Sequence, residues 1–235
     1  MDCMAAMRDM PDNAYDLAIV DPPYGIGCMS MNYTRSGAVR VLSRNSKAAA
    51  TRRDYRKSAD WDVKPGPEYF RELFRVSRNQ IIWGGNYFSD MLPPSKSFLV
   101  WDKRVQDSMR NDFADCEYAW MSEGMGVARI YRYLWNGMLQ GDMKRKQERI
   151  HPTEKPIALY KWILQNYAQP GYKILDTHLG SGASRIAAWE MGYDFTGYEI
   201  DREYFEAQEK RFRAYTAQLN MFVEYGLTEG GASNE

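Results

Sequence analysis

The sequence has few of the residues that crosslink a small protein or bind a metal ion. It contains three cysteines and two histidines in 235 residues. Cys3, Cys28 and Cys116 are an odd number and include no Cys-x-x-Cys pair. Neither a disulfide scaffold nor a His/Cys metal site is therefore expected, and the sequence predicts a reduced, metal-free protein.

Long apolar runs are also missing. No stretch approaches the ~20 consecutive apolar residues that a membrane-spanning helix needs. The segment from Met1 to Asn13 has no apolar core like that of a signal peptide. The apolar fraction of 44% and the charged fraction of 26% are typical of globular proteins. We therefore expect one cytoplasmic domain over residues 1–235, without a membrane partner.

The sequence also lacks an excess of either charge, since 31 basic residues balance 31 acidic ones. Zero net charge does not favour a nucleic-acid partner, but the charge is unevenly distributed. Residues 30–60 hold two acidic and eight basic residues, and the basic ones are Arg35, Arg40, Arg44, Lys47, Arg52, Arg53, Arg56 and Lys57. A second basic cluster follows at Lys144, Arg145 and Lys146. Such patches suit a polyanion, although a solvated loop is the commoner meaning of a charge run. Residues 28–60 also lack apolar periodicity, which predicts a mobile basic loop.

The apolar pattern predicts alternating strands and helices. Strands are expected at residues 16–20, 80–83, 98–102, 117–121, 129–134, 173–176 and 194–200, and helices at 67–76, 157–167, 183–191 and 201–217. The three segments at 98–102, 117–121 and 129–134 are expected to be antiparallel at a sheet edge. The last third of the chain predicts a βαβ nucleotide-binding unit.

The first group of chemically informative residues follows the strand at 16–20: Asp21, Pro22, Pro23 and Tyr24. Ligands in open α/β sheets bind beyond the carboxyl ends of the strands, where these residues are expected. The Asp21 carboxylate and the Pro22 carbonyl can each accept one hydrogen of an amino group, and Tyr24 can stack on a planar ring. The motif therefore suits a base that carries an NH2 group, whereas the alternative is a tight turn after a strand.

The second group comprises Asp176, Gly180, Ser181, Gly182 and the acidic Glu199. Glycines after a strand let the backbone approach a ligand, and an acid at the end of the next strand can bind ribose hydroxyls. The dinucleotide fingerprint would need a glycine at position 185, where this chain has Arg185. The pattern thus favours an adenosine-bearing ligand without a pyrophosphate, and an ordinary βα turn is the alternative.

Four motifs in this order resemble the β-group of DNA amino-methyltransferases, in which the catalytic motif precedes the cofactor motif. They are Tyr15–Gly25, His151-Pro-Thr-Glu-Lys-Pro156, Ile174–Gly182 and Gly197–Asp201. The resemblance spans nearly the whole chain and implies S-adenosylmethionine as the cofactor. It implies cofactor contacts from His151, Thr153, Lys155, Pro156, Asp176, Gly180, Ser181, Gly182, Glu199 and Asp201. Taken alone, residues 151–156 could instead be a helix N-terminus with Thr153 as the cap.

The chain departs from the family at two places. Members usually have Pro-Phe where this chain has Thr177-His178, so His178 is expected either to replace that aromatic contact with the cofactor or to be structural. Members also tend to carry a strand and Gly-Asp before the position of Cys3. That strand is missing here or the true start lies upstream, and Asp2 remains a candidate cofactor contact.

The resemblance implies an α/β, Rossmann-like S-adenosylmethionine methyltransferase fold with a mixed, mostly parallel sheet and helices on both faces. It implies methylation of adenine N6 in double-stranded DNA by base flipping and direct transfer, in a bacterial or phage-infected cell. Asp21 favours adenine, because cytosine-N4 enzymes tend to have Ser there. An RNA or protein-glutamine amino-methyltransferase and an inactive DNA-binding protein are the other hypotheses. Residues 124–150 are the candidate target-recognition region, and a homodimer stays open.

Overall fold

The computed structural model describes residues 1–26, 62–104, 114–136, 139–144, 149–151 and 153–224. The predicted basic loop at residues 28–60 lies outside these residues. Within them, the main sheet has seven strands in the order β5-β3-β4-β2-β1-β8-β9. These strands are β1 (Tyr15–Val20), β2 (Ser77–Trp83), β3 (Phe98–Asp102), β4 (Cys116–Met121), β5 (Arg129–Arg132), β8 (Lys173–Asp176) and β9 (Asp194–Gly197).

All but one of these strands run in the same direction. β1 pairs in parallel with β2 and β8, β8 with β9, and β3 with β5, whereas β4 is antiparallel to both β2 and β3. The prediction of an antiparallel edge is therefore confirmed for β3 and β4 but is wrong for β5. The reason is that β5 pairs with β3 instead of with β4, the strand that precedes it in the chain.

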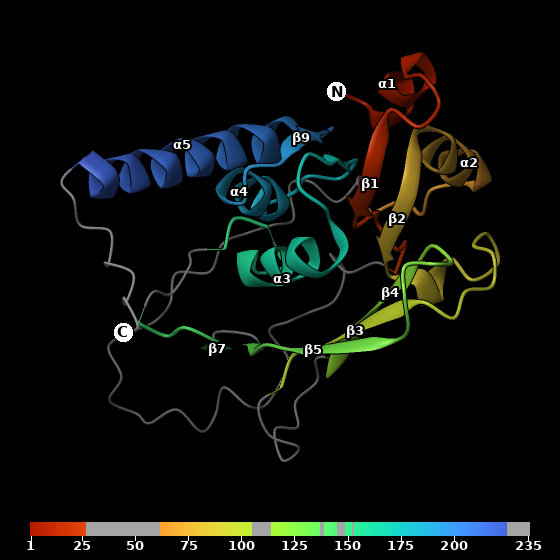
Figure 1. Ribbon diagram of the computed structural model, residues 1–235, viewed down its shortest axis with the longest axis horizontal. Coiled ribbons are helices and arrows are strands. Elements are labelled where there is room, and N and C mark those ends of the chain that lie inside the picture. Colours follow the sequence, from red (N-terminus) through yellow and green to blue (C-terminus); the bar gives the residue numbers. More distant parts are fainter. Residues whose placement is uncertain (27–61, 105–113, 137–138, 145–148, 152, 225–235) are drawn as a thin grey trace.

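Helices cover both faces of the sheet (Figure 1). α1 (Cys3–Asp9) and α2 (Pro67–Val76) lie on one face, and α3 (Ile157–Tyr167), α4 (Ala183–Glu190) and α5 (Arg202–Glu224) lie on the other. A short 3-10 turn, η3 (Gly85–Tyr87), follows β2, and a two-stranded pair, β6 (Trp135–Asn136) with β7 (Leu139–Gln140), follows β5. The predicted α/β fold with helices on both faces is confirmed.

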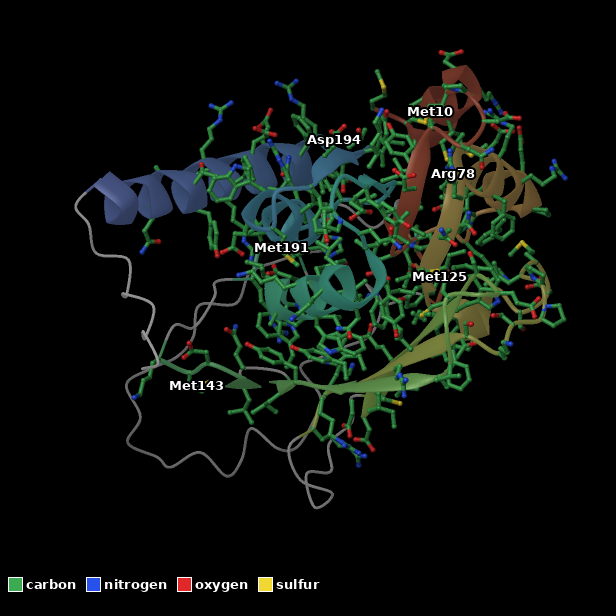
Figure 2. The ribbon with its side chains drawn as sticks, in the orientation of Figure 1. Met10, Arg78, Met125, Met143, Met191 and Asp194 are labelled. Carbon is green, nitrogen blue, oxygen red and sulfur yellow. The ribbon has the colours of Figure 1, made fainter. Side chains whose placement is uncertain are left out.

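The alternation of side chains along β1 divides the core into two clusters. Leu17 and Ile19 belong to the cluster beneath α3 and α4, and Ala18 and Val20 belong to the cluster beneath α1 and α2. Successive strand residues point to opposite faces, so a strand that is buried on both faces is apolar throughout. Figure 2 shows the side chains filling both layers between the helices and the sheet.

Three helix starts follow from local chemistry. The Asp2 carboxylate accepts a hydrogen bond from Met4 N (2.9 Å) and caps α1, a helix that the sequence analysis did not predict. Pro67 begins α2, where its missing N–H costs nothing. Pro156, and not Thr153, is the N-cap residue of α3.

Several predicted elements have different bounds in the structure. β2 begins at Ser77, three residues before the predicted start, and β5 ends at Arg132, two residues before the predicted end. β9 ends at Gly197, before the predicted end at residue 200, because the chain then turns into the loop that holds Glu199. α5 continues to Glu224, seven residues beyond the predicted 201–217. The candidate target-recognition region at 124–150 contains β5, which is part of the main sheet.

The two-sided burial of β1 predicts a large loss of stability when its core side chains are shortened. Ile19→Ala should lower the free energy of unfolding by about 2–5 kcal/mol, because Ile19 is 2% exposed and its removal leaves a cavity. The control Ile130→Ala, in β5 with Ile130 57% exposed, should change it by less than about 0.5 kcal/mol. Urea unfolding followed by circular dichroism measures both. Equal losses in the two variants would contradict this description of the core.

Candidate active site

The two predicted motifs lie at the point in the sheet, between β1 and β8, where the strand order changes direction. β1 and β8 are adjacent and parallel, through the pairs Leu17↔Ile174 and Ala18↔Leu175. From β1 the chain continues to β2 on one side, and from β8 it continues to β9 on the other. In open α/β sheets, ligands bind beyond the carboxyl ends of the strands at such a switch point. Residues 21–24 follow β1, and residues 177–182 follow β8, so the order of the strands brings both segments to the same edge.

The segment after β1 holds an oriented carboxylate beside an aromatic pair. The Tyr24 hydroxyl donates a hydrogen bond to Asp21 Oδ1 (2.7 Å). The Tyr24 ring stacks on Tyr87, with centroids 4.8 Å apart and planes 18° apart, and it meets Phe88 edge-on at 6.1 Å. Burial, followed by the negative charge of Asp21, raises the pKa of Tyr24 well above its usual value. The phenol is therefore a hydrogen-bond donor at neutral pH.

Gly84, between β2 and η3, makes room for this arrangement. Its φ of +70° is a conformation that L side chains rarely adopt, and a Cβ built on it would lie 2.2 Å from Tyr24 Cε1. Gly84 is therefore required both by its backbone and by the ring packed against it. Gly84 and Tyr87 were missed in the sequence analysis, although two glycines after an apolar strand were a visible signal.

The side chain of Lys155 lies at the catalytic motif, although the resemblance implied a cofactor contact. Its ammonium pairs with Asp21 Oδ2, lies 3.1 Å from Glu117 Oε2 and lies 3.5 Å from the Tyr24 hydroxyl. The Lys155 side chain is 2% exposed. Burial opposes the positive charge, but Asp21 and Glu117 outweigh it and raise the pKa of Lys155. The site therefore holds a buried cation between two carboxylates.

Glu117, on β4, is a further site residue that the sequence analysis missed. Its second oxygen, Oε1, accepts a hydrogen bond from Lys103 (3.1 Å). Burial opposes ionisation, but the positive charges of Lys155 and Lys103 prevail and lower the pKa of Glu117. No local motif surrounds Glu117, because its role depends on the antiparallel pairing that brings β4 beside β2.

Glu154 fixes the backbone that carries Lys155. Its side chain is fully buried, with Oε1 2.8 Å from an Arg211 guanidinium nitrogen of α5 and Oε2 accepting from Ile150 N (3.0 Å). Its backbone carbonyl accepts a hydrogen bond from Trp135 Nε1 (2.8 Å). The 151–156 segment is thus anchored on both sides of the residue that precedes Lys155.

The loop after β8 is tied to the acid after β9. Glu199 Oε2 accepts from Gly180 N (2.8 Å), and Oε1 accepts from Asp201 N (2.9 Å). Gly180 and Gly182 both have positive φ, of +51° and +71°. Asp201 itself caps α5 by accepting from Glu203 N (2.8 Å) and Tyr204 N (3.1 Å). The structure therefore brings the predicted Gly loop and Glu199 together, and it gives Asp201 a capping role.

Asp176 is the buried base of this loop. Its carboxylate accepts hydrogen bonds from Ser184 Oγ (2.6 Å) and from His178 N (3.0 Å). Burial raises the pKa of Asp176 to about 7 in spite of these bonds. Ser181, also a predicted cofactor contact, is buried, and its carbonyl accepts from Arg211 (3.0 Å).

The two histidines border the same loop. His178 Nδ1 lies 2.9 Å from Thr177 Oγ1, which in turn lies 2.6 Å from the Tyr69 hydroxyl. The His151 ring packs edge-on against Tyr204, with centroids 4.4 Å apart, and its Nδ1 lies 3.1 Å from Thr153 Oγ1. Burial lowers the pKa of each imidazole to about 4, and for His151 the charge of Lys155 adds to the effect.

The remaining residues that were predicted to contact the cofactor or nucleic acid lie in different parts of the structure or outside the described residues. Asp2 caps α1, and the adjacent Met1 ammonium donates to the Glu199 carbonyl (2.7 Å), so the start of the chain lies beside the Gly loop. Lys144 is exposed. The other predicted nucleic-acid contacts lie outside the described residues: Arg35, Arg40, Arg44, Arg52, Arg53, Arg56, Lys57, Arg145 and Lys146.

The described part of the chain holds no group of three or more His, Cys, Asp or Glu side chains arranged to bind a metal ion. None of the helices described there combines the length and the apolarity needed to cross a bilayer.

The low pKa values predict that both imidazoles stay neutral in mildly acidic solution. Proton NMR of the two histidines should show no titration near pH 6.5 and midpoints near pH 4. In the unfolded chain the imidazoles take up protons below about pH 6.5, so their contribution to the free energy of unfolding should fall as the pH drops from there toward 4. A midpoint near 6.5 for either histidine would contradict its burial.

The comparisons with known proteins agree with the motifs. Residues 101–210 match a family model described as DNA methylase, of the N6/N4 type. YubD of Escherichia coli (strain K12), which its name describes as a methylase, is 23% identical over 241 residues, covering 100% of this chain and 94% of YubD.

Solved structures agree in fold. The M1.HpyAVI–SAM complex has a TM-score of 0.53 at 19% identity, covering 89% of this chain and 96% of that one. PvuII DNA methyltransferase, which is cytosine-N4-specific, has a TM-score of 0.52 at 12% identity, covering 91% and 84%. Together with the order of the motifs along the chain, these findings confirm the resemblance: the protein has the S-adenosylmethionine-dependent methyltransferase fold and is similar to the DNA amino-methyltransferases.

Proposed function

We propose that the protein transfers a methyl group from S-adenosylmethionine to the exocyclic amino group of a base in DNA, with adenine N6 as the preferred acceptor. The observation that carries this proposal is the position of Asp21 and Tyr24 beside the loop at Gly180–Gly182, at the carboxyl ends of two adjacent parallel strands. A base at the first segment and an adenosine-bearing cofactor at the second would have their reacting atoms side by side.

The residues around the Gly loop fit the nucleoside part of the cofactor. Each Glu199 oxygen accepts one backbone hydrogen bond, so each keeps a lone pair for a ribose hydroxyl. Ile200, which is 67% exposed, offers an apolar surface next to this acid for the adenine ring. Among the described residues other than its two chain neighbours, the atom nearest to a Cβ built on Gly180 is His151 Cγ at 3.8 Å, which leaves room for a ligand at this position. When bound, the cofactor supplies a methyl group activated by its positively charged sulfur.

Asp21 and the Pro22 carbonyl are the proposed acceptors for the two hydrogens of the target amino group. Such acceptors draw the nitrogen lone pair out of conjugation with the ring and favour the positive charge that develops on the nitrogen during transfer. The stacked Tyr24–Tyr87 pair, with Tyr87 38% exposed, is the proposed aromatic surface for the base. Taking the base out of the duplex costs a few kcal/mol, which stacking of ~1–3 kcal/mol per base offsets in part.

Nucleoside analysis of DNA from an expressing host tests the proposal directly. A host without amino-methylation of its own should acquire N6-methyldeoxyadenosine, measured by mass spectrometry. The Asp21→Asn variant, which loses the acceptor charge in a buried site, should lower turnover by on the order of 100- to 1000-fold. N4-methyldeoxycytidine alone would make adenine the wrong base. Methylated RNA or glutamine with unmodified DNA would identify another substrate, and cofactor binding without any transfer would leave an inactive DNA-binding protein.

The ribose assignment predicts a loss of cofactor affinity in Glu199→Ala. Removing the acid leaves ribose hydroxyls unpaired and should weaken binding by about 1–3 kcal/mol. The loss should be equal for S-adenosylmethionine and S-adenosylhomocysteine, because both carry the same ribose. Glu206→Ala, on an exposed turn of α5, is the matched control and should bind both normally. Calorimetric titrations in which Glu199→Ala also binds normally would remove Glu199 from the site.

A further inference from the structure

A buried lysine within reach of the proposed acceptor is not explained by cofactor binding. The Lys155 ammonium contacts Asp21, Glu117 and the Tyr24 hydroxyl, and its side chain is 2% exposed. The ammonium also lies 5.1 Å from the centroid of the Trp83 ring. Every one of these contacts belongs to the segment after β1, to β2 or to β4, and none belongs to the Gly loop after β8.

We propose that Lys155 is a positioning residue for the acceptor: its ammonium fixes the Asp21 carboxylate in place, and Glu117 shares the ammonium so that Asp21 keeps acceptor sites for the target amino group. This inference rests on the proposed function. It replaces the cofactor contact that the resemblance implied for Lys155.

The charges of the cluster show why one cation must serve two carboxylates. Asp21 and Glu117 contribute two negative charges, and Lys155 and Lys103 contribute two positive ones. Lys103 contacts Glu117, whereas Lys155 contacts both acids. If Lys155 were neutral or absent, Asp21 would lose its cationic partner beside a second buried carboxylate, and like charges in a dry site favour uptake of a proton. A protonated Asp21 would be a hydrogen-bond donor at one oxygen and a weaker acceptor at the other.

Hydrogen-bond capacity supports the same role. An ionised carboxylate has about four lone-pair sites on its two oxygens. Tyr24 uses one on Oδ1 and Lys155 uses one on Oδ2, which leaves one on each oxygen. Both occupied sites fix the carboxylate plane, so it is oriented before the base arrives. Sharing with Glu117 keeps Lys155 from neutralising Asp21 alone.

Other titratable groups, from α2, α3 and β8, surround the charged cluster of Asp21, Glu117, Lys155 and Lys103. Tyr69 on α2 and Tyr160 on α3 are buried phenols whose pKa values burial raises well above the usual range, so they stay neutral. Asp176, at the end of β8, has a pKa of about 7, raised by burial and in part by Asp21. Asp176 is therefore the one neighbour among these groups whose titration must be distinguished from that of Asp21 and Glu117.

The test is a carboxyl titration that does not depend on turnover. Carbon-13 NMR of the Asp and Glu carboxyls, assigned with Asp21→Asn, Glu117→Gln and Asp176→Asn, follows each group in the full chain. In Lys155→Met the midpoint of Glu117 should rise by about 1 to 3 pH units, because the protein loses a positive charge that lowers the pKa of Glu117 against its burial. The acid limb of the methylation profile should rise with it, and Lys155→Arg should restore both. Affinity for S-adenosylhomocysteine should not change.

Two further variants complete the test: a double variant that can be measured if Lys155→Met does not fold, and a control away from the site. Lys155→Met/Glu117→Gln carries only one of the two acids, so the acid limb of its methylation profile should fall back toward the wild-type position. This double variant still tests the proposal if Lys155→Met alone does not fold. Lys161→Met is the matched control, because Lys161 on α3 pairs with Glu190 away from the site, and it should alter neither titration nor profile.

The outcomes that overturn the proposal are distinct from those that overturn the function. Unchanged carboxyl midpoints in Lys155→Met, or lost S-adenosylhomocysteine affinity with an unchanged pH profile, would show that Lys155 does not control Asp21. If the wild-type protein transferred no methyl group to DNA, the proposed function would fail. The NMR midpoints would still decide whether Lys155 lowers the pKa of Glu117.

Discussion

The parallel pairing of β1 with β8 is the constraint on which the proposed site depends. Each strand is short and apolar, and its carboxyl end leads into a segment that cannot continue the ladder. Pro22 and Pro23 end one strand, and Gly180 and Gly182 follow the other. The chain leaves the two strands in opposite directions across the sheet, and this makes their shared edge a topological switch point. The sheet order thus brings together two motifs that are more than 150 residues apart in sequence.

The polar cluster beside this edge is stable only as a set. A lone buried ammonium or carboxylate would cost several kcal/mol, and pairs recover that cost only with good geometry. Here Lys155 is held by Asp21 and Glu117, Glu117 by Lys103, and Asp21 by Tyr24. The members come from four separate parts of the chain, so the sheet must form before the charges can be paired. This cost suits a functional role for the cluster, since apolar side chains would stabilise the core more simply.

Local patterns predicted the elements well and long-range contacts poorly. The helices at 67–76 and 157–167 and the strands at 98–102 and 173–176 have the predicted bounds, because apolar periodicity and the flanking Pro and Gly residues determine them. The same patterns gave the wrong direction for β5, because that direction depends on its parallel pairing with β3. They also missed Glu117 and Tyr87, and the resemblance placed Lys155 with the cofactor. Each of these residues reaches the site through packing between distant segments. The Glu199 contact to the Gly loop was within reach of the sequence, since both lie in one βαβ unit.

A structure of the protein with S-adenosylhomocysteine and a duplex bearing its target base would test the central claim most directly. The account predicts that the extruded base lies at Asp21, with its amino nitrogen within about 3.2 Å of the carboxylate. It predicts that the nucleoside lies along Gly180–Gly182 with its ribose on Glu199. A base bound away from the end of β1, or a nucleoside held by other residues, would contradict the claim that the two reactants meet at the edge shared by β1 and β8.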